Sequence, residues 1–86
     1  MSWDKSKFKD TLDSAYNFPC SYTFKFIVIS SKKSEVLNLI SNPKFSIKES
    51  RNKKYISITL TSIMKNADEI IYIYKKASKI KGIISL

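Results

Sequence analysis

The sequence is short of histidine, cysteine, glycine and arginine, and each scarcity excludes a class of function. Among its 86 residues there is no histidine and one cysteine, so neither an internal disulfide nor a Cys/His zinc site is possible. Cys20 has no histidine to activate its thiol, and we interpret it as a small core residue rather than a nucleophile. With Gly82 as the single glycine, the chain has no glycine-rich loop to hold a phosphate.

The acidic residues are equally unpromising for catalysis. Seven of them are scattered along the chain, and no pair is evidently brought together by spacing. General acid–base, nucleophilic and metal-assisted reactions therefore lack the residues they need. We expect a protein that is not an enzyme and that has no cofactor and no metal.

Long apolar runs are absent as well. No stretch of about 18 apolar residues occurs, so no membrane span is expected. The first residues, MSWDKSKFKD, carry charges where a signal peptide needs an apolar segment, which predicts an uncleaved cytoplasmic protein. A hydrophobic fraction of 43% is sufficient for one small globular domain.

Positive charge is what the chain has in excess. The net charge is +9, which is typical of nucleic-acid-binding proteins. However, Arg51 is the single arginine among 16 basic residues, and nucleic-acid surfaces favour arginine for bidentate and stacked contacts. Lysine also occurs here with abundant Ile, Asn, Ser, Tyr and Phe, the set that A/T-rich codons favour, so compositional bias is the alternative explanation.

The periodicity of apolar residues divides the chain into a segment at 1–17 and a domain at 18–86. In the first segment Phe8, Leu12 and Tyr16 are spaced for a short amphipathic helix, and a partly flexible segment is the alternative. In the domain, alternating or β-branched runs predict strands at 21–29, 44–50, 53–64 and 82–86, and helical spacing predicts helices at 34–41 and from 67 onward. The residues expected to face the core are Tyr22, Phe24, Phe26, Val28, Val36, Leu37, Ile40, Phe45, Ile47, Ile56, Ile58 and Leu60.

The second predicted helix has a clear start signal. Asn66 can cap the helix, and Glu69 stands three residues later, where a capping box places its acid. The resulting order β-α-β-β-α-β predicts an α+β ferredoxin-like plait, in which two helices cover one face of a four-stranded antiparallel sheet.

Three stretches, in this order and at this spacing, resemble the YbeD-like family of small bacterial proteins of unknown function. They are FPCSYTFKFIV, NKKYISITLTS and IYIYKKASKIKGIISL, and together they extend from about Phe18 to Leu86. The resemblance implies a ferredoxin-like fold similar to that of ACT regulatory domains and no known activity. Family members often have glycine after the first strand, where ACT domains approach an amino-acid ligand. This chain has VISSKK there, which argues against that kind of ligand binding.

The face of the sheet that the helices leave uncovered is the first candidate site. The candidate interaction residues are Lys25, Tyr55, Ser57 and Thr59, since a strand needs only its inward face to fold. An RNA-recognition motif places two or three aromatic side chains on this face, and here Tyr55 stands alone. We therefore expect the Tyr55 ring to pack over Lys25 or against the N-terminal segment.

A second candidate is an anion site at Ser30, Ser31, Lys32 and Lys33, where hydroxyls and cations precede a predicted helix. The expected function is that of an ACT-like regulatory or protein-interaction domain with an unknown protein partner. The alternative is weak, sequence-tolerant nucleic-acid binding through Lys25, Arg51, Lys53, Lys54 and Tyr55. A weak homodimer through the open face, or through an exposed edge strand at 44–50 or 82–86, is also expected.

Overall fold

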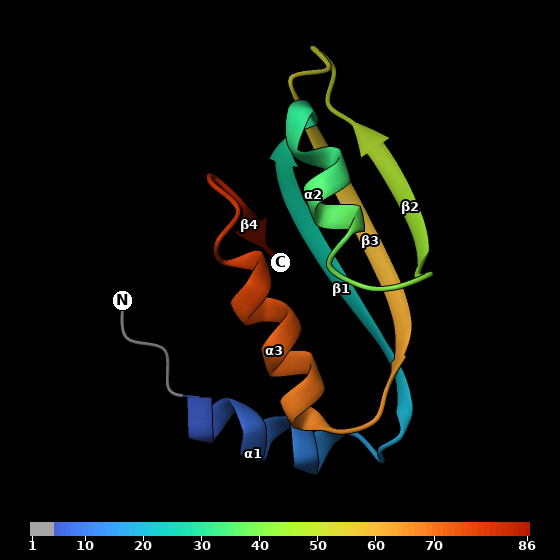
Figure 1. Cartoon of the computed structure of the whole chain (residues 1–86), viewed down its shortest axis with the longest axis vertical. Coiled ribbons are helices and arrows are strands. Elements are labelled where there is room, and N and C mark those ends of the chain that lie inside the picture. Colours follow the sequence, from blue (N-terminus) through green and yellow to red (C-terminus); the bar gives the residue numbers. More distant parts are fainter. Residues whose placement is uncertain (1–4) are drawn as a thin grey trace.

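A four-stranded sheet with helices on one side forms the body of the molecule (Figure 1). The computed structural model describes residues 5–86. In chain order its elements are α1 (Lys5–Ala15), β1 (Cys20–Ile29), a 3₁₀ turn η1 (Ser30–Lys32), α2 (Lys33–Leu37), β2 (Lys44–Glu49), β3 (Tyr55–Met64), α3 (Ala67–Ala77) and β4 (Ile84–Ser85).

The sheet confirms the ferredoxin-like plait. Its strand order is β2-β3-β1-β4, and all three pairings are antiparallel. The central strands β1 and β3 pair over ten residues each, from Cys20 opposite Met64 to Ile29 opposite Tyr55. The helix α1 precedes the β-α-β-β-α-β unit and packs across α3.

The core lies between the sheet and the helices. Every second side chain of the central strands points into it. Phe24, Phe26 and Val28 of β1 are buried, as are Ile56, Ile58 and Leu60 of β3. Burying side chains of this size is worth about 1.5–3 kcal/mol each, which gives the small domain much of its stability. Tyr22 is only half-buried, and so is Cys20, which lies at the start of β1 rather than in the core.

The predictions for β2 and α2 need correction. Phe45 points to the helix side of the sheet, because it lies opposite buried Leu60, but 55% of it is exposed. The predicted helix 34–41 is helical only to Leu37, so it is too short to cover the edge strand. The shortened turn also changes which residue enters the core, since Leu39 is buried where Ile40 was expected.

The start of α3 follows the predicted capping box. The Asn66 side-chain oxygen accepts a hydrogen bond from the Glu69 amide at 2.9 Å. The Glu69 carboxylate accepts from the Lys65 amide at 3.0 Å, one residue before the cap. These bonds satisfy amides that have no partner within the helix, so the helix begins at a defined residue.

Candidate interaction surface

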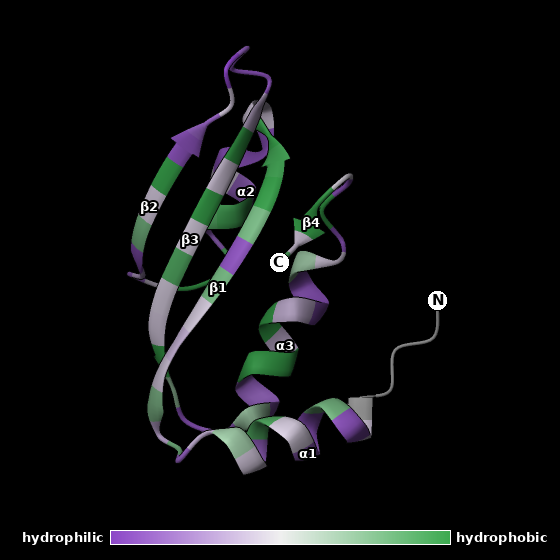
Figure 2. Ribbon diagram, turned by 180° about the vertical axis from the view of Figure 1, so that it is seen from behind, coloured by the Kyte–Doolittle hydropathy of each residue, from purple (hydrophilic) through white to green (hydrophobic). Residues whose placement is uncertain are grey.

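The open face of the sheet carries the four candidate residues in two adjacent strands. Viewed from behind, no helix within residues 5–86 covers this face (Figure 2). Lys25 lies opposite Thr59, and Ser57 lies opposite Ile27. Tyr55 lies at the end of the same row on β3, opposite Ile29. The structure therefore brings Lys25, Ser57 and Thr59 together and leaves Tyr55 near the hairpin end of the strands.

An apolar stripe crosses this face beside the candidate residues. It is formed by Ile27, Ile29, Tyr55 and Ile84. Ile84 is paired with Ile27, and Ile29 with Tyr55, so these side chains share the uncovered side. Ile29, Tyr55 and Ile84 are 41%, 42% and 53% exposed. Leu86 continues the line, because its amide donates to the Lys25 carbonyl at 2.9 Å and places it next to β1.

The sequence predicts one residue of this stripe, Tyr55, as a candidate on the open face. The signal for Ile29 was present in the sequence, since it continues the alternation of β1. Ile84 could not be found in this way, because its position depends on how β4 pairs with β1.

The surroundings of Tyr55 differ from the prediction. The ring lies beneath Lys54, whose Nζ is 5.5 Å from the ring centroid. Lys25 pairs with Thr59, which is four residues further along β3, so packing of Tyr55 over Lys25 is wrong. A cation at this distance from an aromatic ring is attracted to its face. The pair therefore forms a charged boundary at one end of the apolar stripe.

The hairpin between β2 and β3 holds a group of cations in a defined conformation. The Ser50 hydroxyl donates to the Asn52 side-chain oxygen at 2.9 Å, and that oxygen also accepts from the Lys54 amide at 3.1 Å. Lys53 has a φ of 60°, in the left-handed region, and its amide donates to the Ser50 carbonyl. Arg51 is exposed on the same loop.

Ser30 joins this hairpin to the predicted anion site. Its amide donates to the Lys54 carbonyl at 3.0 Å, and its hydroxyl contacts the Lys53 and Lys54 carbonyls at 2.7 and 3.1 Å. The Ser30 side chain is thus directed to the hairpin, while Lys32 forms an ion pair with Glu35 at 3.0 Å. Anion binding by Ser30, Ser31, Lys32 and Lys33 stays a prediction, and of these four residues Ser30 bonds to the backbone of the basic hairpin at Lys53 and Lys54.

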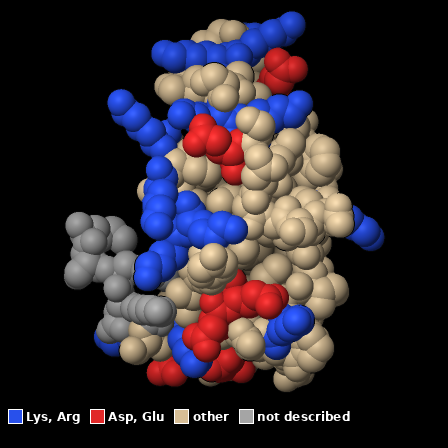
Figure 3. All heavy atoms as spheres, in the orientation of Figure 1, with Lys and Arg blue, Asp and Glu red and all other residues tan. Residues whose placement is uncertain are grey.

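The charges of the described residues are unevenly distributed along the long axis. Seen from the helix side, cations and some acids lie in the hairpin half, cations lie along the middle, and most acids gather at the end where α1 meets α3 (Figure 3). The acids there are Asp10, Asp13, Asp68 and Glu69, and Asp68 pairs with Lys9 at 3.3 Å. A negatively charged partner is therefore attracted to the hairpin half of the molecule.

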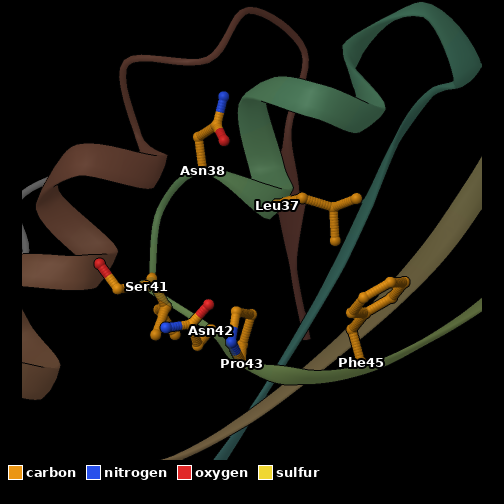
Figure 4. A pocket seen from close by; sticks show the side chains of 7 residues that line it. Leu37, Asn38, Ser41, Asn42, Pro43 and Phe45 are labelled. Carbon is orange, nitrogen blue, oxygen red and sulfur yellow. The ribbon is translucent and has the colours of Figure 1, made fainter.

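A hollow of about 530 Å³ lies where α2 ends short of β2 (Figure 4). Leu37 from α2 and Phe45 from β2 point toward the same space, and Pro43 lies to one side, next to Asn42. The other lining residues are Asn38, Ile40, Ser41 and Asn42. This hollow is the direct result of the early end of α2 and was not predicted.

The helix side also holds one polar contact among aromatic rings. The hydroxyls of Tyr22 and Tyr74 are 3.1 Å apart, and Tyr74 packs edge-to-face on Phe8, Phe24 and Phe26. Burial, reinforced by the hydrogen bond with Tyr22, raises the pKa of the Tyr74 hydroxyl above its usual value. The hydroxyl therefore stays protonated at neutral pH and serves the packing of α3 on β1.

Within residues 5–86, no helix combines the length and apolar character that crossing a bilayer requires. In the same part of the chain, no three Cys, Asp or Glu side chains lie close enough together to hold a metal ion.

Comparison with known proteins confirms the predicted family resemblance. A family model described as "Protein of unknown function (DUF493)", the YbeD family, matches residues 13–86. The solution structure of protein HP0495 from H. pylori is similar, with a TM-score of 0.73 and 21% sequence identity, covering 91% of this chain and 92% of that chain. At this identity the match supports the fold alone. A search of curated proteins finds no match.

Proposed function

The chain belongs to the DUF493 family of proteins of unknown function, and from its surface we propose that it is a non-catalytic module that docks a protein partner on its open sheet face. The observation that carries this proposal is the apolar stripe of Ile27, Ile29, Tyr55 and Ile84 on a face that no helix covers. A sheet face needs no exposed large apolar residues in order to fold, and grouped ones are typical of interaction sites.

The backbone of the sheet limits the kind of partner that fits. The central strands exchange their backbone hydrogen bonds within the sheet, so the open face offers side chains only. A partner segment on this face must satisfy its own backbone groups, and a helix does so internally. We therefore assign an amphipathic helix as the partner element.

The charges beside the stripe indicate the flanks of that helix. Lys25 lies next to the stripe on β1, and Lys48 lies beyond Ser57 on β2. Lys54 covers the Tyr55 ring. A helix whose apolar side is bordered by Asp and Glu complements this arrangement, and such charges favour fast and specific association.

The carboxylates support the non-catalytic part of the proposal. Asp68 is paired with Lys9, Glu69 caps α3, and Glu35 is paired with Lys32. These acids already serve the structure, and the chain has no histidine to act as a general base.

Regulation by an ACT-type amino-acid ligand is a less favourable version of the proposal. The loop after β1 has no glycine, and it turns directly into η1 with Ser30 bonded to the hairpin. Close approach of a ligand to this backbone is hindered by side chains and by the hydrogen bonds of Ser30. Protein docking is therefore the form of regulation that we propose.

The test is an amide NMR titration of labelled protein with a synthetic amphipathic helix that has leucine on one side and glutamate at its borders. Tyr55→Ala should weaken binding by about tenfold, as truncation of an interface anchor does. Lys25→Ala should slow association and reduce the effect of salt.

Tyr72→Ala is a matched control, because Tyr72 is exposed on α3 and lies beneath Lys76 at 5.2 Å, much as Tyr55 lies beneath Lys54. If both open-face variants bind the helix as tightly as the wild type does, the open face is not the docking site.

Nucleic-acid binding is the second candidate, and the joining of two basic segments by Ser30 favours it. The segments contribute Arg51, Lys53 and Lys54 on one side and Lys32 and Lys33 on the other. Binding that neutralises about six phosphates weakens by about 10³ or more between 50 and 200 mM salt. A titration with mixed single-stranded RNA at both salt concentrations separates this function from docking of an apolar helix, whose affinity should change far less.

A further inference from the structure

The outer edge of β2 is a second surface with properties unlike those of the open face. β2 lies at one side of the sheet, and among the described strands it pairs with β3 alone. In the views from both sides no described segment lies beyond it (Figures 1 and 2). An edge of this kind presents backbone groups that another strand can pair with.

The hairpin determines which backbone groups point outward. The Ser50 amide donates to the Tyr55 carbonyl at 2.8 Å, so Ser50 directs its backbone toward β3. Because this direction alternates along an antiparallel strand, Ser46 and Lys48 also bond toward β3. Phe45, Ile47 and Glu49 therefore direct their amides and carbonyls to the free edge.

The hollow beside Phe45 lies on the helix side of this edge. Phe45 is more than half exposed, and Leu37 points into the same space from α2. An added strand places every second side chain on the helix side, next to Phe45 and Ile47. The hollow of about 530 Å³ is roomy enough for a large apolar side chain at that position.

The other side of the edge is basic. Lys44 and Lys48 lie on the open-face side of β2 with Ser46 between them, and both lysines are exposed. The alternate side chains of an added strand meet these lysines, and acidic residues are the complement.

We propose that the β2 edge binds an extended segment of a partner protein in which apolar and acidic residues alternate. The segment adds a strand next to β2, places an apolar side chain in the hollow of Leu37 and Phe45, and sets its acids against Lys44 and Lys48. This recognition mode takes affinity from the backbone and specificity from alternate side chains. It rests on the backbone edge of β2 and the hollow beside Phe45, which the helix proposed for the open face does not use, and the two sites share Lys48 at their border.

A second copy of the chain is a poorer occupant. Two β2 strands joined edge to edge bring Lys44 and Lys48 of both copies into one row on the open-face side. Like charges on neighbouring strands are destabilising. The lysines thus discourage self-pairing while they favour an acidic segment.

The probe for this site is a peptide with blocked ends in which glutamate and valine alternate over about eight residues. Titrated into labelled protein, it should shift the Phe45, Ile47 and Glu49 amides to lower field and slow their hydrogen exchange. Phe45→Ala should weaken binding by about tenfold. Ile63→Ala should leave it unchanged, because Ile63 is a similarly exposed apolar strand residue whose side chain lies on the open face, on the other side of the sheet from the hollow.

Charge reversal provides a variant that touches no core residue. The double variant Lys44→Glu/Lys48→Glu should abolish binding of the alternating peptide. The control Lys75→Glu/Lys79→Glu, with one lysine on α3 and the other just after it, makes the same change in net charge and should retain most of the binding. A peptide of the same composition with the alternation destroyed should bind at least about tenfold more weakly.

Three results would overturn the proposal. The first is no change at the three edge amides at any peptide concentration. The second is a set of shifts confined to Ile27, Tyr55 and their neighbours, which would support the open-face site alone. The third is a dependence of the edge amides on protein concentration without peptide, which would assign the edge to a second copy.

Discussion

The two faces of the sheet are made by the same two central strands, yet their side chains differ in burial and polarity. On the covered face, Phe24, Phe26, Ile58 and Leu60 are fully buried. On the open face, Thr23 lies opposite Thr61 and Lys25 opposite Thr59, and the Thr23 and Thr61 hydroxyls are 3.2 Å apart. Packing against the helices selects shape and volume on the first face, whereas the second face is free of that constraint.

The difference shows which surface of the sheet is available to bind a partner. A residue on the covered face is explained by its contacts within the molecule. The apolar stripe of Ile27, Ile29, Tyr55 and Ile84 is not explained in this way, because no helix in the described part of the chain covers it. Substitutions should therefore affect stability on one face and binding on the other.

The largest effect is expected for Phe24→Ala. Phe24 is completely buried and contacts the rings of Tyr22, Phe26 and Tyr74. Its truncation should lower the free energy of unfolding by about 3–5 kcal/mol, which is the typical cost of an aromatic side chain lost from a core. Urea denaturation followed by circular dichroism measures this cost.

Ile63→Ala is the matched substitution on the open face. Ile63 is 63% exposed on β3, so its truncation should cost less than about 1 kcal/mol. Equal costs at the two positions would show that the open face contributes to stability as the core does.

The fold and the covered face could be predicted because they depend on local patterns. The alternation identified all the buried residues of β1 and all but Met64 of those in β3, and Asn66 with Glu69 identified the start of α3. The coverage of β2 by α2 and the register between β1 and β3 could not be predicted in the same way. The exposure of Phe45 depends on where α2 ends, and the neighbour of Tyr55 depends on how β1 and β3 are aligned.

Phe45→Ala tests an intermediate position between the two faces, since Phe45 points to the helix side of the sheet but is not covered by a helix. With 55% of the residue exposed, its truncation should cost about 1 kcal/mol, well below the cost at Phe24. Urea denaturation of Phe45→Ala beside Phe24→Ala checks this order. A cost at Phe45 as large as at Phe24 would mean that the hollow is closed in solution.

Tyr74→Phe tests the hydroxyl contact between Tyr22 and Tyr74 on the covered face. Loss of the hydroxyl pair should cost about 1 kcal/mol at neutral pH, the usual net value of a hydrogen bond. Tyr72→Phe is the control, because Tyr72 is exposed and should be nearly neutral.

The same variant should change the pH dependence of stability. Burial, together with the Tyr22 hydrogen bond, raises the pKa of Tyr74 in the folded state, so the folded protein holds its proton more tightly than the unfolded chain. The wild type should therefore lose stability as the pH rises above about 10, by up to about 1.4 kcal/mol per pH unit. Denaturation curves at pH 9 to 11 should show a shallower decline for Tyr74→Phe, and parallel declines would contradict the role of this hydroxyl.

The smallest effect is expected for Thr61→Val on the open face. Valine keeps the shape and β-branching of threonine but removes the hydroxyl that lies 3.2 Å from the Thr23 hydroxyl. Both hydroxyls are exposed to water, so water replaces the lost partner, and the free energy of unfolding should change by less than about 0.5 kcal/mol. Thr59→Val, opposite Lys25 on the same strand, provides the comparison in urea denaturation. A loss above about 1 kcal/mol for Thr61→Val alone would show that the hydroxyl pair stabilises the sheet, and that the open face has a structural role besides the binding role proposed for it.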